Sequence, residues 1–280
     1  MNAITRPAPA SSRRANAPSS IGKVLAYQLN DVVRSRWAIA YTLFFLLVTD
    51  ALFRFGGGGT QVILSLLNVV LILIPLVSLV FGTMYLYSTR EFVELMLAQP
   101  VRRADLFAGL YGGLLIPLAV GFVLGTGLPF IWHGAAVAEH LPTLGRLMGV
   151  GVMLTAAFLA LAFWISMRFE DRVKGLGAAL LLWLFLAVVY DGLLLLVAYT
   201  FSAYPLEQPM IALGMLNPIS LARVLLLLTL DVAALLGYTG AAFERFFGTG
   251  LGTALSSGAL VAWWAIPLVF ARRRFLRKDF

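Results

Sequence analysis

Residues 62–87 read VILSLLNVVLILIPLVSLVFGTMYLY and contain no charged side chain. A transmembrane α-helix needs about 20 mostly apolar residues to cross the hydrocarbon core of a bilayer, and this stretch exceeds that length. The whole chain has the same character, because 61% of its 280 residues are hydrophobic, only 12% are charged and the mean hydropathy is +0.92. A soluble domain has about a quarter of its residues charged. The sequence therefore predicts an all-α polytopic membrane protein.

Six more apolar blocks lie along the chain, at residues 37–53, 106–132, 147–167, 175–201, 219–237 and 251–271. Cytoplasmic segments of membrane proteins carry an excess of Lys and Arg, so the basic residues indicate which blocks cross. If every block except 219–237 crosses, 17 of the 21 basic residues lie on one side of the membrane. These are Arg6, Arg13, Arg14, Lys23, Arg34, Arg36, Arg90, Arg102, Arg103, Arg168, Arg172, Lys174, Arg272, Arg273, Arg274, Arg277 and Lys278. We therefore expect six spans, with both termini in the cytoplasm.

The 219–237 block differs from the other six because it contains Arg223 and Asp231. Each of these charges costs a few kcal/mol at the centre of a bilayer. A seventh crossing would also place the basic C-terminal sequence RRRFLRKDF outside the cell, against the usual charge bias. We expect this block, which follows Asn217 and Pro218, to form a re-entrant helix that dips in from the outer side and is buried in protein.

The N-terminal residues divide into two parts ahead of the membrane domain. Residues 1–20 are rich in Ala, Pro and Ser and predict a disordered basic tail. In residues 21–35 the apolar side chains recur at helical spacing, which predicts an amphipathic helix in the cytoplasmic interface. The alternative for this segment is an ordinary cytoplasmic extension. Residues 36–280 then form the six-span domain.

The loop at residues 88–105, STREFVELMLAQPVRRAD, is expected on the cytoplasmic side between the second and third spans. Its residues predict a short amphipathic helix that stops at a proline and leads into the next span. A helix held between two long spans could bind a groove on a soluble partner. The alternative is an interfacial helix whose charges are merely solvated. The candidate docking residues are Arg90, Glu91, Phe92, Glu94, Leu95, Pro100, Arg102 and Arg103, with Met96 completing the expected apolar face.

Asp191, next to Tyr190, is predicted to lie well inside the fifth span. A carboxyl group at that depth must face the bundle interior or an aqueous cavity. It could mark a substrate pathway or fix contacts between helices, and the sequence leaves both interpretations open. Asp50 and Asp231 lie nearer the outer ends of their blocks, where solvation or pairing with Arg54 or Arg223 is expected.

Several kinds of chemistry are disfavoured by the sequence. The chain has no cysteine, and His133, Glu139 and His140 match no metal-ligand spacing, so we expect no metal site. No lysine closes a phosphate-binding loop, so ATP and Mg²⁺ must bind another polypeptide if the protein works with ATP. The basic residues flank apolar blocks and do not form a stripe with interleaved aromatics, so nucleic acid is not an expected partner.

Glycines spaced four residues apart, including the pairs Gly121/Gly125 and Gly145/Gly149, permit close approach of helices. They predict tight bundling, and they are compatible with a homodimer without requiring one.

The order of these parts, with the loop REFVELMLAQPVRRADL between spans two and three, resembles the ABC-2 type transporter permeases. The segments VVYDGLLLL, LNPISLARVLLLLTLD and GYTGAAFERFFG resemble the branch of this family that supports maturation of nitrous oxide reductase, a copper enzyme. The resemblance covers most of the chain from about residue 21, and the Pro/Ser/Arg tail departs from it.

The resemblance implies a homodimer in the bacterial inner membrane that carries a cytoplasmic dimer of a separate ABC ATPase. It further implies that the 88–105 loop couples to the ATPase and that a periplasmic accessory protein docks on the outer side. Two alternatives stay open. One is a generic ABC-2 exporter of lipid, polysaccharide or drug, and the other is a non-transport membrane scaffold or enzyme subunit.

Overall fold

A computed structural model describes residues 36–56, 59–98, 101–133, 137–201, 207–229 and 250–277. Every regular element within these ranges is a helix. The predicted tail and interfacial helix at residues 1–35 lie outside the described residues, as do Gln99, Pro100 and Asp231.

Six helical segments are long and apolar enough to cross a membrane, which confirms the six-span prediction. The first four are α2 (Arg36–Phe55), α3 (Gly59–Ser88), α5 (Arg103–Trp132) and α6 (Val137–Arg168). The fifth is continuous through α7 (Arg172–Leu184), the π-helical turn η2 (Phe185–Val189) and α8 (Tyr190–Thr200), and the sixth is α12 (Gly250–Arg277). The 30 residues of α3 rise about 45 Å, which exceeds the roughly 30 Å of the hydrocarbon core.

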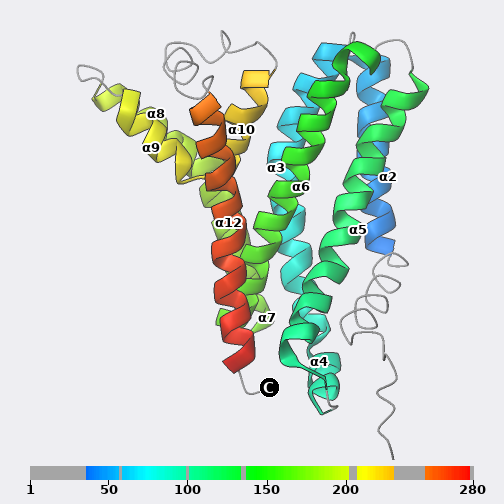
Figure 1. Ribbon diagram of the computed structural model, residues 1–280, viewed down its shortest axis with the longest axis vertical. Coiled ribbons are helices and arrows are strands. Elements are labelled where there is room, and N and C mark those ends of the chain that lie inside the picture. The colour runs from blue at the N-terminus through cyan, green and yellow to red at the C-terminus, as the bar shows by residue number, and fades with distance from the viewer. Residues whose placement is uncertain are drawn as a thin grey trace, which may run out of the picture.

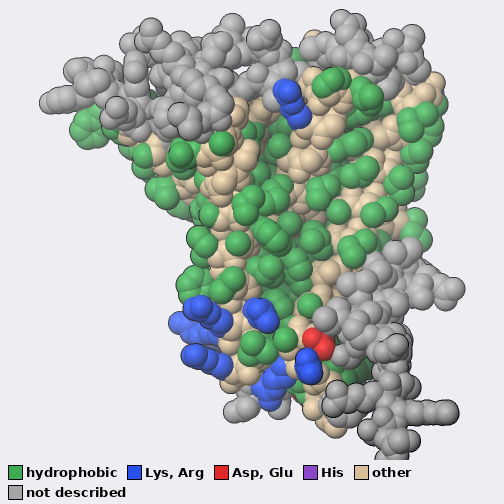
Figure 2. All heavy atoms as spheres, viewed as in Figure 1, with side chains coloured by type: hydrophobic (Ala, Val, Ile, Leu, Met, Phe, Trp, Pro, Cys, Tyr) green, Lys and Arg blue, Asp and Glu red, His purple; other side chains and the backbone are tan. Residues whose placement is uncertain are grey.

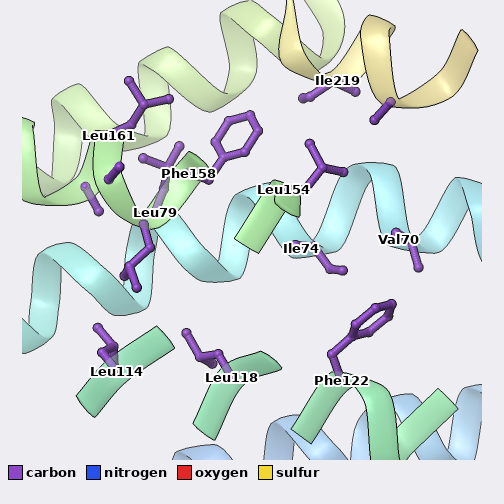
Figure 3. Packing of buried hydrophobic residues seen from close by; sticks show 14 of the residues in the cluster. Val70, Ile74, Leu79, Leu114, Leu118, Phe122, Leu154, Phe158, Leu161 and Ile219 are labelled. Atoms are coloured by element: carbon purple, nitrogen blue, oxygen red, sulfur yellow. The ribbon is translucent and has the colours of Figure 1, made fainter. Parts of the chain in front are cut away.

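Helices α2, α3, α5 and α6 stand side by side in one part of the bundle, and α12 and the fifth span lie on the other side of α6 (Figure 1). Their interface is apolar and densely packed, since Phe122, Phe158 and Ile74 are completely buried among leucines from α3, α5 and α6 (Figure 3). The helices therefore associate mainly by side-chain packing, as expected where lipid competes for apolar surface.

The glycine pair in α5 allows α2 to approach closely. A Cβ atom at Gly121 would lie 2.5 Å from the Thr42 hydroxyl, and one at Gly125 would lie 2.7 Å from the Thr42 carbonyl oxygen and 2.8 Å from Phe45 Cβ. At Gly145 and Gly149 in α6, an added Cβ atom would meet nothing within 4 Å among the residues that the structure describes. Only the first pair thus acts as a close-packing site within one chain.

Basic side chains gather at the end of the bundle where α4 (Arg90–Leu97) lies, below a belt of apolar side chains (Figures 1 and 2). Four helix ends meet there: the ends of α3, α6 and α12 and the start of α7. Tyr87 on α3 donates to the carbonyl of Phe169 over 2.8 Å, and Arg103 on α5 donates to the carbonyl of Leu276 over 3.3 Å. We call this the basic end, and the opposite end of the bundle the outer end.

The fifth span starts at the basic end with a helix cap. Asp171 accepts hydrogen bonds from the backbone N–H groups of Val173 and Lys174, at 2.7 and 3.2 Å. The hydrogen bonds from Lys174 and then Val173 lower the pKa of the Asp171 carboxyl group. Along the same helix, Gly175 lies against the ring of Tyr87, where any side chain would clash.

The 219–237 block does not cross the bundle within the residues described. Helix α9 (Glu207–Met215) descends from the outer end, and α10 (Pro218–Thr229) returns towards it, so the two form a re-entrant hairpin (Figure 1). The predicted re-entrant helix corresponds to α10, and its partner α9 was not anticipated. With 12 residues, α10 rises about 18 Å, which is too short to span the hydrocarbon core.

Candidate functional site

Helix α4 lies at the basic end between α3 and α5 and presents one face outward (Figure 1). Glu91, Glu94 and Leu95 are exposed, and the Leu95 side chain is 68% exposed. Arg90 and Glu94 form an ion pair of 3.7 Å along the helix. An exposed leucine beside two carboxylates is a surface that a partner protein can cover.

The inward face of α4 differs from the sequence prediction. Val93, which was not among the predicted apolar residues, is the buried one at 3% exposure, while Phe92 and Met96 are half-buried. Leu95 points outward because the helix turns Val93 toward a small cavity that Phe275, Ser166 and Met167 also line. Helix α4 therefore packs against the two spans that flank it in sequence and shares a cavity with the ends of α6 and α12.

The remaining predicted residues of this loop are placed at its edges. Arg102 is exposed, and Arg103 is half-buried where it donates to the end of α12. Pro100 lies outside the described residues.

The second region of interest is the apex of the α9–α10 hairpin, where Asn217 is completely buried. Its Nδ2 donates to the carbonyl of Leu186 over 2.7 Å, and its Oδ1 accepts from the backbone N–H of Ile219 over 3.0 Å. One side chain thus caps α10 and ties the hairpin to η2. Because Leu186 belongs to the π-helical turn, the hairpin contacts the fifth span at its irregular point.

Asp191 lies just beyond η2 and faces α10. Its Oδ2 is 2.6 Å from Arg223 Nη1, and its Oδ1 accepts from the Ser220 hydroxyl over 3.1 Å. Arginine remains protonated in proteins, so this geometry is that of an ion pair supported by a neutral hydrogen bond. Tyr190 adds a bond of 2.5 Å from its hydroxyl to the carbonyl of Leu213 on α9.

The contact between Arg223 and Asp191 was not anticipated from the sequence. The reason for this contact is geometric: α10 starts at the apex, so its second turn runs beside the first turn of α8. Asp231, which was expected to be solvated or to pair with Arg223, lies outside the described residues, so that expectation stays a prediction.

At the outer end, Asp50 gathers three partners from α2 and α5. Arg54 Nε lies 2.7 Å from Asp50 Oδ2, as expected, and Trp132 Nε1 donates to Oδ1 over 3.3 Å. His133 Nε2 is 3.8 Å from the same oxygen, and its ring stacks on Phe53. Within the described ranges, no three His, Asp or Glu side chains lie together as metal ligands would. The side chains of Glu139 and His140 lie outside the described residues.

Contributors that sequence reasoning missed include Val93, Phe275, Trp263 and Ser220. Phe275 is buried at 1% exposure beside the cavity under α4, although it sits among the C-terminal arginines. Trp263 on α12 donates to the carbonyl of Met215 at the hairpin apex over 3.2 Å. A lone aromatic inside a basic tail was a usable signal for Phe275, whereas the partner of Trp263 depends on tertiary contacts alone.

A family model described as ABC-2 family transporter protein matches residues 23–280. The chain belongs to this family of transporter permeases. Among curated proteins, it is 30% identical over 223 residues to the probable ABC transporter permease protein NosY of Pseudomonas aeruginosa, covering 74% of this chain and 81% of that protein. It is 26% identical over 288 aligned positions to the protein of the same name in Stutzerimonas stutzeri, covering 93% of this chain and 99% of the relative.

Proposed function

We propose that this chain is the homodimeric transmembrane subunit of an ABC transporter driven by a separate cytoplasmic ATPase dimer, and that α4 is the element on which the ATPase docks. The observation that carries the proposal is the placement of α4. It sits at the basic end between two long spans, with Glu91, Glu94 and Leu95 exposed together. ATP and Mg²⁺ would bind to the ATPase.

The orientation that this function requires places the basic end in the cytoplasm and the hairpin on the periplasmic side of a bacterial inner membrane. Charge supports it, because the described basic residues near the outer end are few: Arg54, Arg146 and Arg223. Arg223 is neutralised by Asp191, and Arg54 by Asp50. The positive-inside bias then assigns the α4 end, and both termini, to the cytoplasm.

A second copy of the chain fits the exposed side of the fifth span. Only 6% of the most apolar window of this span is buried within one chain, against 67% for α6. Leu181, Val188 and Leu195 are large apolar side chains on that surface and more than half exposed. Lipid could cover this apolar surface equally well. The proposal of a homodimer therefore rests on the exposed surface together with membership of the ABC-2 family.

Docking on α4 is tested by charge reversal. The double variant Glu91→Lys, Glu94→Lys should bind the ABC ATPase about ten-fold more weakly or worse, because like charges would face each other across the interface. Glu170→Lys, at the same end on the α6–α7 turn, is the matched control and should keep binding. Copurification in mild detergent with measured ATP hydrolysis gives the result. Full capture and stimulation of the ATPase by the double variant would refute docking on α4.

For the biological role, we propose support of copper-site maturation in nitrous oxide reductase, together with a periplasmic accessory protein. The likeness to two proteins named NosY supports this branch. Deletion of the chain should abolish nitrous oxide reduction by whole cells, and a plasmid copy should restore it. Unchanged reduction would favour the second candidate, a generic ABC-2 exporter of lipid, polysaccharide or drug, which shares the family match.

The scaffold or enzyme alternative has less support from the contacts in the described part of the chain. It would use Asp191 or the outer histidines, and Asp191 is engaged by Arg223 and Ser220. His133 Nδ1 lies 3.0 Å from the carbonyl of Pro129, and its ring is stacked on Phe53. Asp191 and His133 are therefore both engaged by structural contacts, and the side chain of His140 lies outside the described residues.

A further inference from the structure

Five aromatic side chains form a continuous path from the cavity under α4 into the middle of the bundle. Phe275, which borders the cavity under α4 with Val93, has its ring centroid 5.4 Å from that of Phe107. Phe107 lies 5.7 Å from Phe163, and Phe163 lies 5.3 Å from Tyr111. The Tyr111 hydroxyl accepts a hydrogen bond of 2.9 Å from Trp264 Nε1 and donates to the Ala156 carbonyl over 2.8 Å.

The path continues across α12, because the residue next to Trp264 contacts the hairpin. Adjacent residues of an α-helix point about 100° apart, so Trp264 faces α5 while Trp263 faces the apex of the hairpin. Trp263 donates to the Met215 carbonyl, two residues before Asn217. The apex in turn holds η2 through Asn217 and Leu186. One helix therefore connects, through two neighbouring indoles, the α4 end of the bundle and the re-entrant hairpin.

We propose that Trp263 and Trp264 are positioning residues that transmit movement of α4 to the hairpin apex. The inference rests on the proposed ATPase-driven function. Close-packed interiors transmit displacement because their side chains have little room to yield, and the rings here are buried or half-buried. The two indole hydrogen bonds fix direction as well as distance, so α12 cannot turn without moving both the Tyr111 and the Met215 contacts. A contiguous network of this kind needs a direct test of coupling.

The test uses the absence of cysteine from the natural chain. Leu216→Cys, whose parent side chain is 59% exposed beside the apex, carries an environment-sensitive maleimide dye. The labelled protein is reconstituted with its copurified ABC ATPase in nanodiscs, and the fluorescence change on adding ATP is recorded. Trp263→Phe and Trp264→Phe each remove one N–H donor while retaining an aromatic ring.

Trp183→Phe is the matched control. Trp183 on α7 donates to the Ile72 carbonyl over 3.1 Å, so this variant loses an indole hydrogen bond of similar length that lies off the path. We call the path through Trp264 and Trp263 the relay, and Trp263→Phe and Trp264→Phe the relay variants. Both relay variants should lower the ATP-dependent fluorescence change by about three-fold or more, within the usual range of coupling effects, while ATPase binding persists. The Trp183 variant should respond like the Leu216→Cys parent.

The outcomes separate the relay from the proposed function. A full response in both relay variants would overturn the relay and leave the transporter assignment intact. An equal loss of the fluorescence change in all three variants would also overturn it, because removing any indole hydrogen bond would then reduce the response. No response in the Leu216→Cys parent, despite bound and active ATPase, would contradict both the relay and the proposed coupling.

Discussion

Helix α6 and the fifth span are both long apolar helices, yet they are held in the molecule by different forces. Two-thirds of the most apolar window of α6, 67%, is buried against its neighbours, and the corresponding share for the fifth span is 6%. Phe158 and Leu154 of α6 are completely enclosed, whereas Leu195 of α8 is 72% exposed. Helix α6 is packed over most of its surface, whereas the fifth span is packed along one edge.

Apolar packing holds the fifth span along that edge, where Ala179 and Leu186 are buried, and three polar contacts add to it. Trp183 bonds to α3, Leu186 accepts from Asn217, and Asp191 pairs with Arg223. Hydrogen bonds between membrane helices contribute about 0.6 kcal/mol on average, far less than a filled apolar interface. Helices α2, α3, α5 and α6 therefore form the scaffold, whereas the fifth span is packed along one edge only and is further positioned by these polar contacts.

The largest expected effect comes from removing a ring from the scaffold. Phe158→Ala should lower the free energy of unfolding by about 3–5 kcal/mol, because it leaves a cavity in place of a completely buried ring. Leu195→Ala on the exposed face should change it by about 0.5 kcal/mol or less. Reversible unfolding in mixed micelles measures both. Similar losses for the two variants would mean that the two helices are not held differently.

The next prediction compares a glycine at a close helix contact with a glycine on an open helix surface. Gly125→Val should destabilise by about 1–3 kcal/mol, because its Cβ would lie 2.8 Å from Phe45 Cβ and 2.7 Å from the Thr42 carbonyl. Gly145→Val in α6 meets no described atom within 4 Å and should be tolerated within one chain. Thermal denaturation followed by size exclusion measures both variants. If Gly145→Val proves the more harmful, the open side of α6 is covered by another chain.

A smaller effect is expected from the ion pair that holds the hairpin. A double-mutant cycle on Asp191→Asn and Arg223→Gln should give a coupling energy of about 0.6–1.7 kcal/mol, between the average and the largest value for polar contacts between membrane helices. Expression and oligomeric state should stay near those of the parent. Should Asp191→Asn fold normally and yet abolish function while the coupling energy is zero, the carboxylate would belong to a cargo pathway and not to the hairpin contact.

The smallest effect concerns the helix cap at the start of the fifth span. Since backbone hydrogen bonds lower the pKa of Asp171 in the folded state, its stabilising contribution is complete at neutral pH. That contribution fades as the pH falls below about 4, through the depressed pKa. Asp171→Asn retains a capping side chain without a charge, so its melting temperature should depend less on pH in that window. A parent and variant with parallel pH profiles would show that the cap charge contributes nothing.

Sequence reasoning recovered the spans because hydropathy and length leave little choice in a bilayer. It also identified the re-entrant block, since Arg223 could not cross unpaired at low cost. It could not assign Asp191 as the partner of Arg223, because that pairing depends on where α9 and α10 turn. The inward face of α4 could not be predicted either, because Val93 lines a cavity with Phe275, which lies far along the chain on another helix.

The orientation of the bundle is the claim on which the docking helix, the hairpin and the relay all depend. Because the natural chain has no cysteine, Leu95→Cys on α4 and Leu141→Cys at the outer end of α6 can each be labelled alone. A membrane-impermeant maleimide should label the Leu95 variant only in inside-out vesicles and the Leu141 variant only in right-side-out vesicles. Labelling of the Leu95 variant from the periplasmic side would contradict the account.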